Sequence, residues 1–268
     1  MTSQNSSRTL TKRKMWLILL LPLWTYGVFM SLQFLVAYLA QFLVWVGVPL
    51  VSINPVVFNA VFSAIVYGLA IVLVIWLPWR IKKSKTTRDD IGLTGPLSWL
   101  DIGLTPVVMI GYMILSGIII SVASSILPID MNQSQALPVD ASMLVTNWQY
   151  VVAFLMLVIL APVGEELLFR GYLYGKLRKS APIWVAVLVT SLTFGLAHLW
   201  TGGDGPLQWA VAIDTFVLSL VMCSVREYTG AIWITIFMHM TKNGLAFYLL
   251  FVNPQFVDQI RAALLPLL

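Results

Sequence analysis

The sequence predicts an all-α fold, a polytopic bundle of transmembrane helices, and three observations carry this prediction. Charged residues are scarce, because 16 Lys and Arg with 11 Asp and Glu make up only 10% of the 268 residues, where a soluble domain carries roughly 25%. Hydrophobic residues make up 59% of the chain, and the mean hydropathy is +0.89. No charged residue occurs from Met15 to Trp79, a stretch that can cross a bilayer twice at about 20 residues per crossing.

Seven apolar segments follow one another along the chain. Unpaired backbone is costly in lipid, and the segments are longer than barrel strands, so we expect each to be a helix. We expect about seven spans, with an eighth only if residues 255–268 cross the bilayer rather than lie at its interface. The predicted spans cover residues 20–46, 56–79, 103–127, 147–174, 182–200, 207–225 and 230–251.

The first span follows a basic stretch that contains Arg8 and Lys12–Lys14, as the core of a signal peptide would. Its apolar run is longer than the roughly 7–15 residues of a signal core and shows no convincing cleavage site, so we interpret it as a retained helix. Turn-forming and charged stretches separate the later spans. These stretches are 53–55, 80–90, 128–138, 176–179, 201–206 and 226–230.

Positive charge gathers on one side of the predicted bundle. If the N-terminus is cytoplasmic, the inner segments hold 13 of the 16 basic residues, and Arg261 is the one cation in the outer segments. This distribution satisfies the positive-inside rule and predicts a cytoplasmic N-terminus; the small size and compact loops favour a bacterial cell membrane. Basic clusters beside apolar runs suit a lipid bilayer rather than nucleic acid. The single cysteine, Cys223, excludes an intrachain disulfide framework.

Ionisable residues inside the predicted spans are the candidate functional groups, because a charge at mid-bilayer costs about 2.5–3.5 kcal/mol. At about 1.5 Å per residue, Glu165, His239 and His198 lie roughly 16, 18 and 27 Å from the nearest inner loop. One shared site is compatible with these depths if helix tilt absorbs the difference. The whole set is Glu165, Glu166, Arg170, His198, Asp214, His239 and Lys242.

Helical spacing assigns these residues to faces. Glu166 and Arg170 stand at i and i+4, acid before base, so they can pair along one face. Glu165, about 100° further round the helix, is then free to face a cavity. His239 and Asn243 also stand at i and i+4 and point the same way.

This set of side chains permits two chemistries. A carboxylate with two imidazoles and an amide offers a base to activate water and donors for a developing oxyanion. Equally, Glu165, His198 and His239 make a two-histidine, one-glutamate ligand set for zinc, although no H-E-x-x-H helix is present. The cofactor is left open, with zinc as one option.

The same residues also have structural readings. A Glu166–Arg170 pair would clamp one helix, and a lone histidine would hydrogen-bond to a neighbouring helix. Asp214 and Lys242 would form a buried ion pair or a proton relay. A relay suits an ion-coupled transporter, but the chain shows neither the internal repeat nor the paired broken helices that transporters have.

Three motifs lie in order on consecutive apolar segments: EELLFR at 165–170, F-x-x-x-H at Phe194 and His198, and H-x-x-x-N at His239 and Asn243. This ordered set resembles the CPBP intramembrane proteases, which include the type II CAAX prenyl endopeptidases and the Abi-type bacterial proteins. The motifs span residues 165–243, and the earlier spans match the family only in being hydrophobic.

The resemblance implies a role for each matched residue. Glu165 would be the catalytic glutamate, and His198 would help it to activate water. His239 and Asn243 would form the oxyanion hole. Nothing carries over to Lys242. The residues assigned to supporting the site are Glu166, Arg170 and Phe194.

We therefore predict an intramembrane endopeptidase that acts on a peptide or a membrane protein. Residues 1–146 would form the N-terminal tail and first three helices, residues 147–251 a catalytic four-helix core, and residues 252–268 a C-terminal tail. The alternative is a non-catalytic member of the same family, such as a bacteriocin immunity protein or a membrane scaffold.

Overall fold

The computed structural model describes residues 12–130, 137–200, 207–256 and 259, and within these residues the chain forms helices and no strands. The predicted all-α class is confirmed. The predicted eighth span lies largely outside the described residues. In chain order, the helices are α1 Lys12–Trp45, α2 Pro55–Lys82, α3 Trp99–Ile126, α4 Asn147–Phe154, α5 Ala161–Glu166, α6 Tyr174–Ser180, α7 Ile183–Ala197, α8 Trp209–Thr229 and α9 Trp233–Phe247.

Helices α4, α5 and α6 form one continuous helix, Asn147–Ser180. It passes through π-helical turns at Leu155–Leu160 and Leu167–Leu173, and a third such turn, Tyr248–Val252, extends α9. All seven predicted segments are therefore helical. Several helices run beyond the predicted ends. Helix α1, for example, begins at Lys12 rather than at residue 20, so it includes basic residues that precede the apolar stretch.

Five helices in the described part of the chain are long and apolar enough to cross a membrane. The segments predicted at 182–200 and 230–251 are not among them. Helix α7 has 15 residues and is about 22 Å long at about 1.5 Å per residue, shorter than the roughly 30 Å hydrocarbon core. Helix α9 has 15 residues and continues through its π-helical turn to Val252. Helix α7 packs against α8, and α9 packs against α3 and α5.

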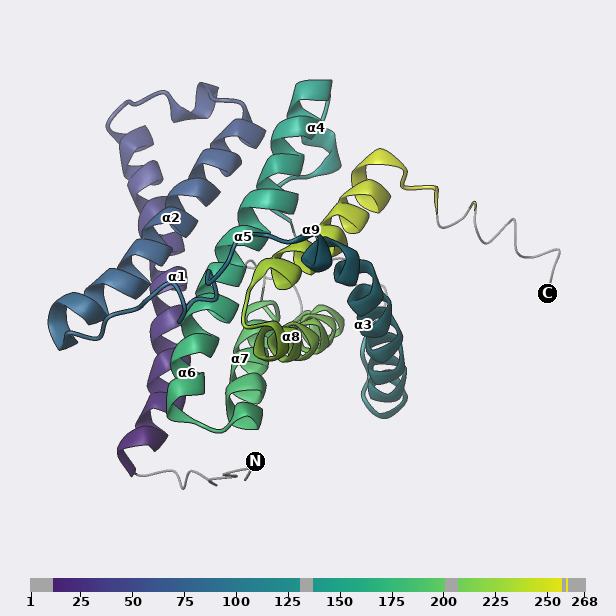
Figure 1. Cartoon of the computed structure of the whole chain (residues 1–268). Coiled ribbons are helices and arrows are strands. Elements are labelled where there is room, and N and C mark those ends of the chain that lie inside the picture. The colour runs from purple at the N-terminus through teal and green to yellow at the C-terminus, as the bar shows by residue number, and fades with distance from the viewer. Residues whose placement is uncertain (1–11, 131–136, 201–206, 257–258, 260–268) are drawn as a thin grey trace, which may run out of the picture.

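The long helix α4–α6 runs through the middle of the molecule (Figure 1). Helices α1 and α2 pack together on one side of it, and α3 lies on the other side against α8 and α9. Helix α7 lies along α8. This arrangement brings α2, α5, α7 and α9 around one central region.

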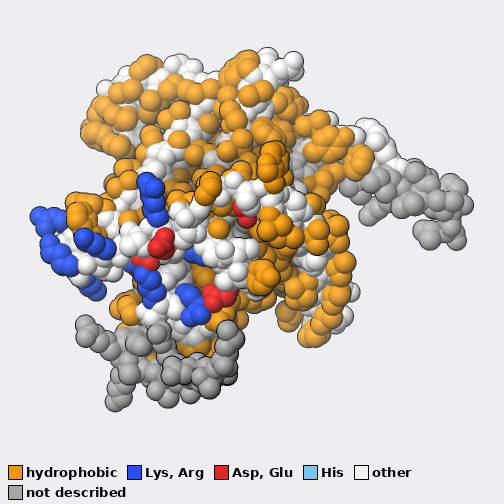
Figure 2. Space-filling view, viewed as in Figure 1, with side chains coloured by type: hydrophobic (Ala, Val, Ile, Leu, Met, Phe, Trp, Pro, Cys, Tyr) orange, Lys and Arg blue, Asp and Glu red, His pale blue; other side chains and the backbone are white. Residues whose placement is uncertain are grey.

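Apolar side chains cover most of the face shown in Figure 2, and the charged side chains gather in one part of it. The outward side chains include large ones that are well exposed, such as Leu23 at 70% and Val107 at 63%. A surface of this kind suits lipid rather than water. Together with the five long apolar helices, it identifies an integral membrane protein.

The loop between α2 and α3 is held against α6. Asp90 pairs with Lys176 at 3.6 Å and also with Lys179. Burial acts to raise the pKa of Asp90, but hydrogen bonds from Lys179 and Thr87 outweigh it and lower the pKa to about 2. The backbones approach so closely that a Cβ at Gly175 would collide with the Asp90 carbonyl oxygen. The loop is therefore a packed part of the fold.

Candidate active site

The two glutamates of the first motif end α5, between two π-helical turns. Pro162 in α5 has no N–H and cannot continue the hydrogen-bond ladder of a helix. In the turn before it, the Ala161 N–H bonds to a carbonyl five residues earlier. In that register the Leu157 carbonyl would face Pro162, so the proline leaves it without its backbone donor.

Asn243 of α9 supplies the donor that this carbonyl lacks. Its Nδ2 donates to the Leu157 carbonyl oxygen at 2.9 Å. Asn243 and His239 line the same cavity, so the predicted shared face is present. One amide N–H of Asn243 is used in this bond, and the other is left for a ligand.

Glu166 is fully buried and joins two helices. Its Oε1 accepts from Arg170 Nη1 at 2.8 Å and from His239 Nδ1 at 2.9 Å. The predicted Glu166–Arg170 pair is confirmed, with both side chains 0% exposed. The Arg170 guanidinium also lies 4.0 Å from the ring centroid of Phe194. The pair therefore fixes the imidazole of His239 as well as clamping its own helix.

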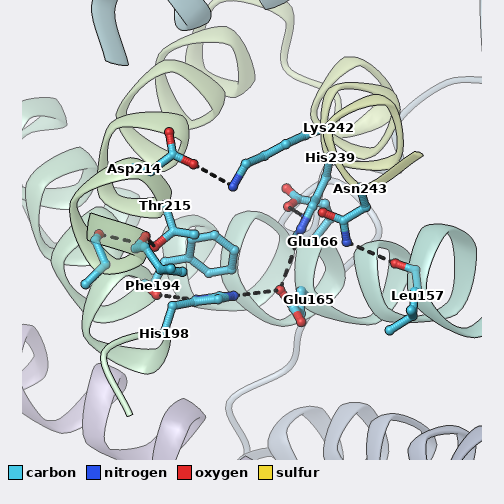
Figure 3. A network of polar contacts seen from close by, with 12 residues as sticks. Leu157, Glu165, Glu166, Phe194, His198, Asp214, Thr215, His239, Lys242 and Asn243 are labelled. Atoms are coloured by element: carbon cyan, nitrogen blue, oxygen red, sulfur yellow. Dashed lines mark hydrogen bonds and ion pairs between the residues drawn. The ribbon is translucent and has the colours of Figure 1, made fainter. Parts of the chain in front are cut away.

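His198 and His239 turn their outer nitrogens toward the same carboxylate oxygen (Figure 3). His198 Nε2 lies 3.9 Å and His239 Nε2 lies 3.8 Å from Glu165 Oε2. His198 Nδ1 is 2.8 Å from the Phe194 carbonyl, which can only accept, so this nitrogen carries the proton. The buried ring of Phe194 packs against both imidazoles, with centroids 4.7 and 5.8 Å away.

Glu165 is held by a residue that the sequence did not point to. The hydroxyl of Tyr67 on α2 donates to Glu165 Oε1 at 2.6 Å. Glu165 Oε2 is buried and has no hydrogen-bond partner among the described residues. A Cβ at Gly164 would lie 2.5 Å from Tyr67 Cδ1, so the glycine makes room for the ring. A tyrosine in a charge-free apolar segment gave no periodic signal by which to find it.

Two cavities meet at Glu165. One, of about 390 Å³, lies among α1, α2 and α7 and has aromatic walls that include Tyr26 and Phe29. The other, of about 200 Å³, lies toward α8, α9 and the π-helical turn Leu155–Leu160. Tyr67, Glu165 and His198 line both. The Glu165 side chain therefore lies on a wall that the two cavities share.

Both candidate imidazole ligands stand farther from Glu165 Oε2, at 3.9 and 3.8 Å, than two ligand atoms of one zinc ion do. Zinc binds nitrogen and oxygen at about 2.0–2.2 Å in tetrahedral geometry, so two of its ligand atoms are about 3.3 Å apart. The described residues contain no group of three or more His, Cys, Asp or Glu side chains that could hold a metal ion. The predicted ligand set of Glu165, His198 and His239 does not fit zinc in this geometry.

Asp214 and Lys242 form an ion pair between α8 and α9, with Nζ and Oδ2 2.7 Å apart. The geometry matches the ion-pair alternative considered for them.

A helical membrane protein whose buried carboxylate faces two imidazoles where two cavities meet has the parts of a hydrolase that works inside the bilayer. Residues 147–245 match the model of a family described as type II CAAX prenyl endopeptidase Rce1-like. This match agrees with the resemblance of the motifs to the CPBP proteases, and it covers the segment that carries them.

The chain is also similar to an Escherichia coli protein described as an uncharacterized 24.3 kDa protein. The two are 30% identical over 101 residues, which is 36% of this chain and 44% of the relative. The chain thus matches less than half the length of that relative. No solved structure matches the chain.

Proposed function

We propose that this protein is an endopeptidase that hydrolyses a peptide bond of a membrane-associated substrate with water activated by Glu165. The observation that carries the proposal is the meeting of one carboxylate oxygen with two imidazole nitrogens, at 3.8 and 3.9 Å. A single water molecule about 2.8 Å from each atom bridges such a gap with ordinary hydrogen bonds.

In the proposed reaction, this water gives one hydrogen bond to Glu165 Oε2 and the other to His198 Nε2. Glu165 removes the first proton, and the resulting hydroxide attacks the carbonyl carbon of the substrate. The π electrons of the carbonyl move onto its oxygen. The Tyr67 hydroxyl holds Glu165 Oε1, which leaves Oε2 aimed at the water.

Asn243 and His239 are the proposed donors to the oxyanion. Asn243 has one N–H beyond the bond to Leu157. His239 must carry both protons to donate from Nε2 while Nδ1 is bonded to Glu166, whose carboxylate is the counter-ion for that charge. When the oxyanion collapses, the carbonyl re-forms, the C–N bond breaks, and Glu165 returns its proton to the leaving amine.

We place the N-terminus and the α2–α3 loop on the cytoplasmic side of a bacterial cell membrane. The support is the charge distribution: 13 of the 16 basic residues lie in the segments that would then be inside.

The test uses the full chain in detergent micelles with a mixture of synthetic peptides, and mass spectrometry identifies new chain ends. We expect the wild type to generate new carboxyl ends and Glu165→Gln to lower the rate about 10²–10⁴-fold, the usual contribution of a general base. Asp89→Asn is the matched control, because it removes one carboxylate at an exposed loop position. Cleavage by Glu165→Gln at the wild-type rate would reject the assignment. If neither the wild type nor the control cleaves any peptide, the result would favour the alternative of a non-catalytic member of the family.

A further inference from the structure

Lys242 places a cation on the wall of the cavity that contains Glu165. Among the described residues that line this cavity, it is the one Lys or Arg. It lies outside the family motifs, one residue before Asn243. Lys242 forms an ion pair with Asp214, and its ammonium does not lie within 4.0 Å of the Glu165 carboxylate. The ammonium therefore stands beside the water-activating centre rather than in it.

The partner of Lys242 is fixed from the far side by another helix. Asp214 Oδ1 accepts from the Tyr112 hydroxyl at 2.6 Å and from the Ser116 hydroxyl at 2.5 Å, both on α3. Asp214 Oδ2 forms the ion pair with Lys242 (Figure 3). Asp214 itself does not line the cavity. Asp214 thus holds the lysine from outside the cavity, and Lys242 is the member of the pair that lines it.

A purely structural ion pair explains this placement poorly. Taking two charges out of water offsets most of their mutual attraction, so such pairs add little stability. Here both side chains also keep some exposure, 22% for Lys242 and 23% for Asp214. One of the three N–H bonds of the ammonium points to Asp214, and the others are available to a ligand.

We propose that Lys242 binds a carboxylate of the substrate, in a subsite next to the scissile bond. This inference rests on the proposed endopeptidase function. A carboxylate is the natural partner, because charge-assisted hydrogen bonds are strong and strengthen further away from bulk water. The carboxylate comes from the C-terminus of the substrate or from an Asp or Glu side chain near the cleaved bond.

The experiment measures binding in the Glu165→Gln background, where no cleavage interferes. The probe is a fluorescent nine-residue peptide of Ala, Leu and Val in three forms: an amidated C-terminus, a free C-terminus, and an amidated C-terminus with one Glu next to it. We expect one or both charged forms to bind about tenfold more tightly than the neutral form. The form that does so identifies the source of the carboxylate.

This preference should disappear in Lys242→Met and Lys242→Gln, and persist in Lys242→Arg. Lys82→Met, an exposed lysine outside the cavity, is the control for the loss of one positive charge. The inference is overturned if the Glu165→Gln protein binds the charged and neutral peptides equally, or if a monodisperse neutral variant at position 242 still binds a charged peptide more tightly. Two neutral variants are used so that the test survives if one of them fails to fold. If the preference for a charged peptide depends on Lys242 but the wild-type protein cleaves no peptide, the protease proposal alone would be rejected.

Discussion

Glu165 and Glu166 are neighbours in sequence with different surroundings, because successive helical residues point about 100° apart. Glu166 is 0% exposed and bonded to Arg170 and His239. Glu165 faces two cavities and is held at one oxygen by Tyr67. One glutamate thus positions a histidine, and the other is left to meet water.

Tyr67→Phe should lower kcat about tenfold with little change in KM, because it removes one hydrogen bond to a carboxylate and no contact that we assign to the substrate. Steady-state kinetics on the cleaved peptide check this. Tyr38→Phe, at an exposed position on α1, is the control and should cleave normally. An unchanged kcat in Tyr67→Phe would show that Glu165 does not depend on this bond.

Gly164→Ala should destabilise the protein by about 1–3 kcal/mol, as overpacking does, since the added Cβ would meet the Tyr67 ring at 2.5 Å. Thermal unfolding in detergent measures the change. Gly111→Ala is a matched substitution in a membrane helix, where a Cβ would have no atom within 4 Å. Equal stability of the two variants would contradict the packing argument.

At the scale of helices, the sequence predicts those features that repeat regularly along the chain. Charge-free apolar runs gave the seven helical segments, and i, i+4 spacing gave the Glu166–Arg170 pair. The π-helical turn before Pro162 could not be predicted, because the Leu157 carbonyl in it accepts from Asn243 of α9 rather than from the backbone. Tyr67 was missed for a similar reason: its partner lies 98 residues away, and neither residue marks the contact.

Asp90 tests how firmly the α2–α3 loop is docked. Its pKa of about 2 in the folded protein lies below its ordinary value of 3.8, so the ionised form stabilises the fold. That contribution, about 1–2 kcal/mol, is present above pH 3.8 and is lost as the pH falls toward 2. Asp90→Asn should therefore be less stable at neutral pH, with a gap that narrows below about pH 4. Unfolding curves of both proteins measure the gap, and a constant gap would contradict the assignment.

On the scale of the whole molecule, the chain combines an apolar exterior with a polar interior. Lipid-facing side chains are large and exposed, whereas ion pairs and histidines lie among α5, α7, α8 and α9. The first helices are more than membrane anchors, because α2 contributes Tyr67 and α3 fixes Asp214. The site is therefore a property of the whole bundle.

The proposed orientation predicts which loops a reagent outside the cell can reach. The native Cys223 is buried, so background labelling should be low. In intact cells, a membrane-impermeant maleimide should label Ser142→Cys, on the exposed α3–α4 connection, and not Ser84→Cys on the α2–α3 loop. Ser84→Cys should react after the membrane is opened. The reverse pattern would place the N-terminus outside.

The most direct test of the central claim, that the carboxylate of Glu165 activates water, is chemical rescue of Glu165→Ala. The cavities of about 390 and 200 Å³ that meet at this side chain leave room for a formate ion. Peptide cleavage by the variant should fall about 10²–10⁴-fold and recover in part, saturably, as formate is added. Undiminished cleavage by Glu165→Ala without formate would contradict the account.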